Sequence, residues 1–93
     1  MDIRLIEELI FEIRADYQIP PYLSSETIER SIRTCAAALL QMNPLTDFDN
    51  QTSRRLLRDY VYYDINHRSE EFPQNYAADI LAWQLSQEVV SSE

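Results

Sequence analysis

Apolar residues recur every three or four positions in four segments of the chain, with polar residues between them. Residues three and four apart share one face of an α-helix, so this spacing predicts helices near 2–16, 25–42, 50–67 and 73–89. No segment shows the strict apolar and polar alternation that is typical of a half-buried strand. We therefore predict an all-α fold, a small four-helix domain built from antiparallel helix hairpins, with no sheet.

Proline-containing segments separate the first three predicted helices, IPPYLSS at 19–25 and NPLTDFDN at 43–50. Proline cannot continue a helix, and it holds the residue before it in an extended conformation. We expect apolar side chains to hold both segments to the body: Ile19, Tyr22 and Leu23 in the first, Leu45 and Phe48 in the second. The last two helices are joined by the short turn HRSEEFP, which favours antiparallel neighbours, and Pro73 suits the first position of the fourth helix.

The last two helices carry more apolar surface than one stripe each. In the fourth helix, two rows alternate: Ala77, Leu81 and Leu85, and Tyr76, Ile80 and Trp83. In the third, apolar side chains occupy more than half of the circumference: Leu56, Leu57, Tyr60, Val61, Tyr62 and Tyr63. We expect that one monomer core cannot bury all six of these side chains of the third helix, which leaves its tyrosines either for a protein interface or at the surface with hydrated hydroxyls.

The length of 93 residues fits a single domain, 1–93, whose last residues, 89–93, are expected to fray. Glycine is absent, which disfavours phosphate-cradling loops and helices closed by glycine. The N-terminal segment is amphipathic and acidic, so we expect no signal peptide. No apolar run approaches the roughly 20 residues of a membrane span.

The net charge of −8 comes from sixteen acidic and eight basic residues, and every base is arginine. Nucleic-acid binders and proteins that lie on anionic membranes need a basic surface, so both classes are disfavoured. Residues 69–93 contain five acids and no base, whereas Arg54, Arg55 and Arg58 gather at the start of the third helix. This end of a helix is unfavourable for cations, so we expect acidic partners on another chain or in the C-terminal segment.

Candidate chemistry is weak throughout the sequence. Cys35 lies in an apolar helical row and is expected to be a small buried hydrophobe. His67 near Asp64 lacks a second His or a Cys, so it is a weak metal ligand and is expected to be a helix-end imidazole. Asp47 and Asp49 lack the glycine and the distal glutamate of an EF-hand. We predict no catalytic residues, no metal, no cofactor and no enzymatic activity.

Three stretches resemble a known family: DYQIPPYLSSETIERSIRTCAAALLQMNP at 16–44, D-x-D at 47–49 and RRLLRDYVYYDINHRSEEFPQNYAADILAWQLS at 54–86. They resemble the small head–tail connector (head-completion adaptor) proteins of tailed bacteriophages, particularly those of phages and prophages of Gram-positive bacteria. Order and spacing carry the resemblance: Ile19-Pro20, Tyr22-Leu23, Leu56-Leu57, Tyr60, Tyr63, Glu71-Phe72, Asn75-Tyr76, Ile80-Leu81 and Gln84-Leu85.

This resemblance implies an α-helical subunit that forms a ring of about a dozen copies beneath the portal protein. Such a ring extends the DNA channel without binding DNA specifically, and it docks the next neck or tail protein. The implied location is the host cytoplasm during assembly and then the virion neck, with no membrane contact. The family brings no catalytic residues.

Seven residues are our candidates for protein contacts, chosen from the arginine cluster, the tyrosines and the acidic turn: Arg54, Arg55, Arg58, Tyr62, Tyr63, Glu70 and Glu71. The alternative function is that of a small acidic helical regulator that binds one host protein and blocks or mimics DNA contacts. A small hydrolase has almost no support in the sequence.

Overall fold

The computed structural model describes the backbone of residues 1–91 and the side chains of residues 1–85. This part of the chain contains five helices and no strand, which confirms the all-α prediction: α1 (Ile3–Asp16), α2 (Ser25–Met42), α3 (Gln51–Ile65), α4 (Glu71–Asn75) and α5 (Ala77–Ser91). Of the residues expected to fray, 89–91 belong to α5, and residues 92–93 lie outside the described part.

Short polar side chains start the first three helices. Asp2, Ser24 and Asn50 each have extended backbone angles, and each side chain accepts a hydrogen bond from a backbone N–H in the first turn. These contacts satisfy donors that the helix itself leaves without partners. The local sequence therefore sets where the three helices begin.

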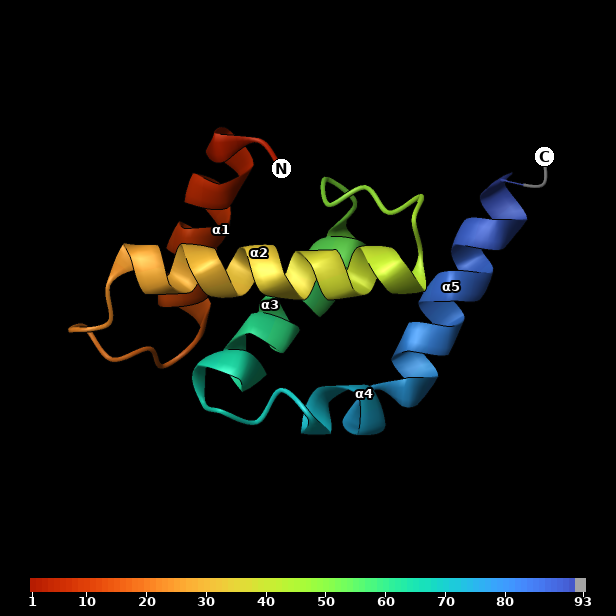
Figure 1. Ribbon diagram of the computed structural model, residues 1–93. Helices are drawn as coiled ribbons and strands as arrows, with labels where there is room; N and C mark the ends of the chain where they lie inside the picture. Colours follow the sequence, from red (N-terminus) through yellow and green to blue (C-terminus); the bar gives the residue numbers. More distant parts are fainter. Residues whose placement is uncertain (92–93) are drawn as a thin grey trace.

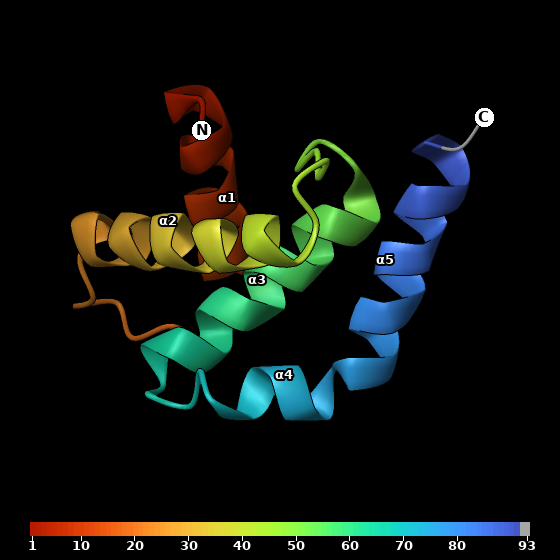
Figure 2. The ribbon, with the colours of Figure 1, turned by 45° about the vertical axis from the view of Figure 1, so that its right-hand side comes forward.

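The first three helices form the body of the molecule, with α2 lying across α1 and α3 (Figures 1 and 2). The most extensive contact is between α2 and α3 rather than between the last two helices. The fully buried side chains come from all three helices and from Phe72 of α4. Those of the three helices are Ile6, Leu9, Ile13, Ile28, Ile32, Cys35, Leu39, Ser53, Leu57 and Val61. One hydrophobic core thus extends from α1 through Phe72 of α4 to Trp83 of α5.

The predicted fourth helix is two helices. α4 begins at Glu71, so Pro73 occupies the third helical position, still within the first turn where its missing N–H is not needed. Tyr76 then leaves the helical conformation, with φ −110° and ψ 17°, before α5 begins. The prediction of a single helix from 73 was therefore wrong, because one non-helical residue redirects the chain.

α3 and α5 run in broadly opposite directions, and α4 lies between the C-terminal end of α3 and the N-terminal end of α5 (Figure 2). α5 therefore lies at one side of the body and makes its main contacts with α3 and α4. Two hydrogen bonds fix it there: Trp83 Nε1 donates to Ser53 Oγ at 2.8 Å, and Gln84 Nε2 donates to the Met42 carbonyl at 3.0 Å.

α3 ends without glycine in a Schellman motif. The Arg68 N–H bonds to the Tyr63 carbonyl at 2.8 Å, and the His67 N–H bonds to the Asp64 carbonyl at 3.0 Å. His67 therefore occupies the left-handed region, with φ 59°, the position that usually belongs to glycine. The prediction that His67 lies at a helix end is confirmed. Its role in the described structure is to supply the left-handed backbone conformation that ends α3.

The proline segments are held less completely than expected. Ile19 and Leu23 are half-buried and Phe48 is buried, but Tyr22 and Leu45 project into solvent. Those two expectations were wrong, because an apolar residue in a loop has no periodic neighbours that fix its direction. None of the described helices combines the length and apolar composition needed to cross a membrane.

Candidate functional site, a network of arginines and the surface beside it

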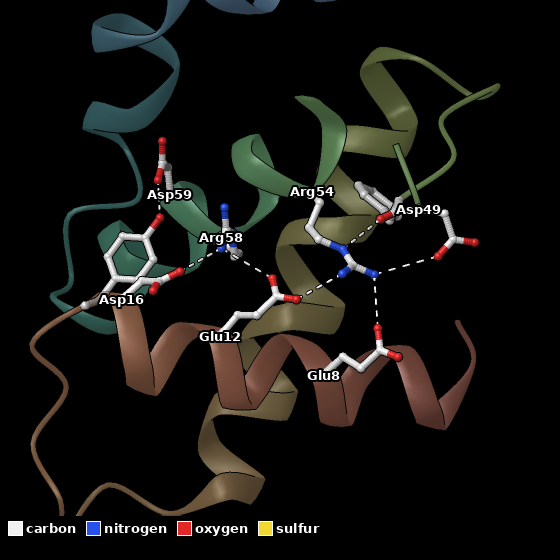
Figure 3. A network of polar contacts seen from close by, with 9 residues as sticks. Glu8, Glu12, Asp16, Asp49, Arg54, Arg58 and Asp59 are labelled. Atoms are coloured by element: carbon white, nitrogen blue, oxygen red, sulfur yellow. Dashed lines mark hydrogen bonds and ion pairs between the residues drawn. The ribbon is translucent and has the colours of Figure 1, made fainter. Parts of the chain in front are cut away.

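Arg54 joins α3 to the acidic side of α1 (Figure 3). Its Nη1 lies 2.9 Å from Glu12 Oε2, and its Nη2 lies 3.3 Å from Glu8 Oε1 and 3.7 Å from Asp49 Oδ1. Its Nε also donates to the Phe48 carbonyl at 3.2 Å. The side chain is only 19% exposed, so this guanidinium is committed to contacts within the chain.

Arg58, one turn further along α3, continues the same network. Its Nη1 lies 2.9 Å from Asp16 Oδ2 and 3.3 Å from Glu12 Oε1, so Glu12 bridges the two arginines. On the same side of α3, the Tyr17 hydroxyl donates to Asp59 (Figure 3). Burial of the ring and this hydrogen bond raise the pKa of Tyr17.

These contacts correct our reasoning about the arginine cluster. We expected its acidic partners on another chain or in the C-terminal segment, but α1 supplies them to Arg54 and Arg58. The charges that are unfavourable at the start of α3 are thus compensated by the neighbouring helix. Arg55 differs: it is 74% exposed, and its described ion-pair contact is Asp59, at 3.9 Å.

The aromatic residues of α3 also find partners within the monomer. Tyr60 stacks on Phe72 with ring centroids 4.3 Å apart, and Phe72 stacks on Tyr76 at 4.4 Å. Tyr63 meets the edges of both Phe72 and Tyr76, at 5.7 and 5.8 Å. Together with Tyr62, whose ring lies 5.1 Å from Tyr17, all three tyrosines of α3 are half-buried.

The monomer core thus buries only part of the apolar surface of α3, as expected, and the three tyrosines keep partial exposure. Leu56, Leu57 and Val61 are buried, and α4 and the end of α1 cover the tyrosine faces. Burial raises the pKa of Tyr76 to about 12, with Asp59 adding to the effect, and it also raises the pKa of Tyr60.

The acidic turn remains at the surface. Glu71 accepts two hydrogen bonds from Arg68, at 2.8 and 2.9 Å, and this contact lowers the pKa of Glu71. Glu70 is exposed. Of the seven contact candidates, Arg55, Glu70 and Glu71 are thus at the surface, Tyr62 and Tyr63 are partly accessible, and Arg54 and Arg58 serve the monomer. A role of any of them in contacts between proteins stays a prediction.

Nucleophiles and metal ligands do not converge in the described residues. Cys35 is buried in the core, and burial, together with the nearby Asp64 carboxylate, raises the pKa of its thiol to about 12. Asp64 itself accepts a 2.5 Å hydrogen bond from Ser31 Oγ. Nowhere in the described part do three His, Cys, Asp or Glu side chains gather as a metal site requires.

The outer side of α5 is the surface that the sequence analysis missed. Ile80 and Trp83 turn towards the body, whereas Leu81 is 57% exposed, Leu85 is 51% exposed, and Ala77 is exposed on the same row. Periodicity identified both rows of α5 but did not show which of them the body covers. The sequence feature that could have indicated this exposed apolar surface is its composition, since α5 has a single charged residue, Asp79, between Ala77 and Leu85.

A pocket of about 250 Å³ lies on the other side of α5 from this row, between α5 and the first half of α3. Its apolar walls come from Leu56, Tyr76, Ala82 and Trp83, and Asp79 and Arg55 contribute polar groups. This volume suits one large side chain better than a small-molecule ligand, for which sites are usually larger.

Comparisons of this chain with protein-family models, with curated proteins and with solved structures found no match.

Proposed function

We propose that this chain is a structural subunit of the neck of a tailed phage or prophage, a head–tail connector that assembles as a ring under the portal protein. The ring extends the DNA channel and docks the next neck or tail protein. The observation that carries the proposal is the exposed apolar row of α5, Ala77, Leu81 and Leu85, on a helix attached to the body by one side only. The resemblance of residues 16–86 to connector proteins gives this surface its context.

A protein that works by assembly needs surfaces of this kind. A helix with apolar residues on opposite sides is normally covered on both, and a single domain leaves such a face open at a cost in solubility. Subunits in a ring or a stack can cover each other's open faces. Isolated copies are expected to stay monomeric, because a charge of −8 on each copy opposes association until a portal collects them.

The decisive experiment is deletion of the gene from the phage or prophage that encodes it, with electron microscopy of the lysate after induction. The expected result is DNA-filled heads without necks and free tails beside them, restored to whole virions by the wild-type gene on a plasmid. Intact tailed virions at the normal titre would reject the connector and favour the acidic regulator of a host protein.

DNA binding gives a second, independent measurement. The arginines of the α1–α3 network are occupied by carboxylates, and few basic groups remain for phosphates. A mobility-shift assay at about 150 mM salt is expected to show no complex with duplex DNA, since binders rely on many phosphate contacts. Micromolar affinity at that salt concentration would contradict a ring that lets DNA pass.

A further inference from the structure

The pocket of about 250 Å³ between α3 and α5 has an apolar floor and opposite charges on its two walls. Leu56 and Trp83 line it and are buried, so they form the floor. Arg55 of α3 and Asp79 of α5 line it and are exposed, so they stand at its mouth. The described ion-pair contact of Arg55 is Asp59, at 3.9 Å, rather than Asp79. An occupant that matches this pocket is therefore a large apolar side chain with an acid and a base beside it.

The outward face of α1 carries such a group. Phe11 is 74% exposed and lies on the opposite side of α1 from the buried residues of that helix. Arg4 and Glu7 precede it by seven and four residues, so the three side chains lie on successive turns of one face. Arg4 and Glu7 are both exposed, and neither makes an ion pair with another of the described side chains. The face therefore presents an aromatic ring with one charge of each sign.

We propose that the pocket between α3 and α5 receives Phe11 of a second copy of this chain. In this contact, Glu7 of the second copy lies beside Arg55, and Arg4 of the second copy lies beside Asp79. The ring covers the apolar floor, and each exposed charge meets a charge of opposite sign. The net charge of −8 on each copy opposes the same contact, so it is specific but weak between isolated subunits.

Other exposed apolar side chains of the chain match the pocket less well. Tyr22 is 87% exposed, but the charged residues nearest to it in the sequence, Asp16 and Glu26, are both acids. Leu45 is 67% exposed and is likewise followed by an acid, Asp47. Phe11 combines a large ring, high exposure and charges of both signs on one helical face.

The two halves of the contact belong to different surfaces of the molecule. α3 lies between α1 and α5 and contacts both (Figures 1 and 2). The outward face of α1 is directed away from the body, so a chain does not fill its own pocket. A contact between two different surfaces repeats from copy to copy, and it closes into a ring when the rotation permits. The proposal thus rests on the proposed function and names the contact between neighbouring subunits of the ring.

The test uses two variants of the full-length chain that can form this contact in one direction only. Phe11→Gln keeps the pocket but lacks the ring, whereas Ala82→Leu keeps the ring but fills the pocket that Ala82 lines. Isotope-labelled Phe11→Gln is titrated with unlabelled Ala82→Leu up to about 1 mM, at about 150 mM salt, and amide shifts are followed by two-dimensional NMR. The control is the same titration with an unlabelled chain that carries both substitutions.

We expect saturable shifts of amides in residues 50–56 and 76–83 of the labelled chain, and at least tenfold weaker binding of the doubly substituted control. Arg4→Glu in the unlabelled chain is expected to weaken binding several-fold, and Asp79→Arg in the labelled chain to restore it. Neither change removes an ion pair of the described monomer, so the effect reports the contact between copies. The matched control is Tyr22→Gln in the unlabelled chain, which removes an even more exposed aromatic ring and is expected to leave binding unchanged.

Four results would overturn the proposal. The absence of shifts up to about 1 mM would show that the pocket does not receive this chain. Equal shifts with Ala82→Leu and with the double variant would show that Phe11 is not the anchor. Shifts confined to the row Ala77, Leu81 and Leu85 would place the contact on the other side of α5. Failure of the reversed charge pair to restore binding would reject the charge pairing. The gene deletion decides the connector function separately, so the two failures are distinguishable.

Discussion

Replacement of Arg54 by methionine measures whether the arginine network holds the monomer together. Methionine keeps an unbranched apolar stem but removes the contacts to Glu12, Glu8 and the Phe48 carbonyl. The Glu12 contact is short and only partly exposed, so it contributes about 1.5 to 3 kcal/mol as a charge-assisted hydrogen bond. The half-exposed Glu8 contributes about 0.5 kcal/mol or less.

The net effect is smaller than the sum of these contributions. Glu12 keeps Arg58 at 3.3 Å, and Glu8 and Asp49, which lose their ion-pair partner, are exposed enough to be hydrated. The cost of desolvating the guanidinium also disappears with it. We expect Arg54→Met to lower the free energy of unfolding by about 2 kcal/mol, and Tm by roughly 10 °C for a domain of this size. The assay is urea unfolding followed by circular dichroism at 222 nm, with an unchanged slope showing that the folded state is the same.

The control is its neighbour on α3. Arg55→Met removes a 74% exposed side chain with a single 3.9 Å ion-pair contact, and we expect a change within about 0.5 kcal/mol. A double-mutant cycle with Arg54→Met and Glu12→Gln is expected to give a coupling energy of about 1 to 2 kcal/mol. If Arg54→Met changes the free energy of unfolding as little as Arg55→Met, the network does not stabilise the monomer. The prediction that Arg54 contacts another protein would then be favoured again.

Three further measurements test other parts of the structure. His67→Gly is expected to stabilise the protein by about 1 kcal/mol, because glycine has no steric cost at φ 59°; a lower Tm would contradict the Schellman geometry. Ser53→Ala removes the buried acceptor of Trp83 Nε1 and is expected to cost about 1 to 3 kcal/mol, whereas an unchanged unfolding midpoint would show that α5 is not fixed there. Stability is expected to fall as the pH rises above about 9 to 10. The folded state raises the pKa values of Cys35 and Tyr17 from 9.0 and 10.0, so it keeps protons that the unfolded state loses at this pH. A Tm that stays constant from pH 8 to 11 would contradict this.

The sequence was sufficient for the helices whose ends are set locally. Ser24 and Pro44 bracket α2, and the predicted range of 25–42 agrees with the observed helix. A cap and a proline act through the residues next to them, so they can be recognised without knowing the fold. The break at Tyr76 could not be recognised in this way, because it depends on tertiary contacts. It lets the Tyr76 ring stack on Phe72 while α5 turns towards Ser53.

The candidate site depended on distant geometry. Arg54 and Glu12 are 42 residues apart, and the spacing along either helix cannot show which side of α1 faces α3. Likewise, periodicity identified two apolar rows in α5 but could not decide which one the body covers. The buried Ser53–Trp83 hydrogen bond decides it, because it fixes the Trp83 edge of the helix against α3.

The use of arginine without lysine has a consequence for how this protein meets others. Six of the eight arginines make ion pairs or hydrogen bonds within the described part of the chain: Arg14, Arg33, Arg54, Arg55, Arg58 and Arg68. A guanidinium can bridge several acceptors from a fixed position, as Arg54 does between α1 and the segment before α3, whereas an ammonium group is a more mobile single point of charge. The bases are thus used largely within the monomer, and the acid excess remains for contacts with other molecules.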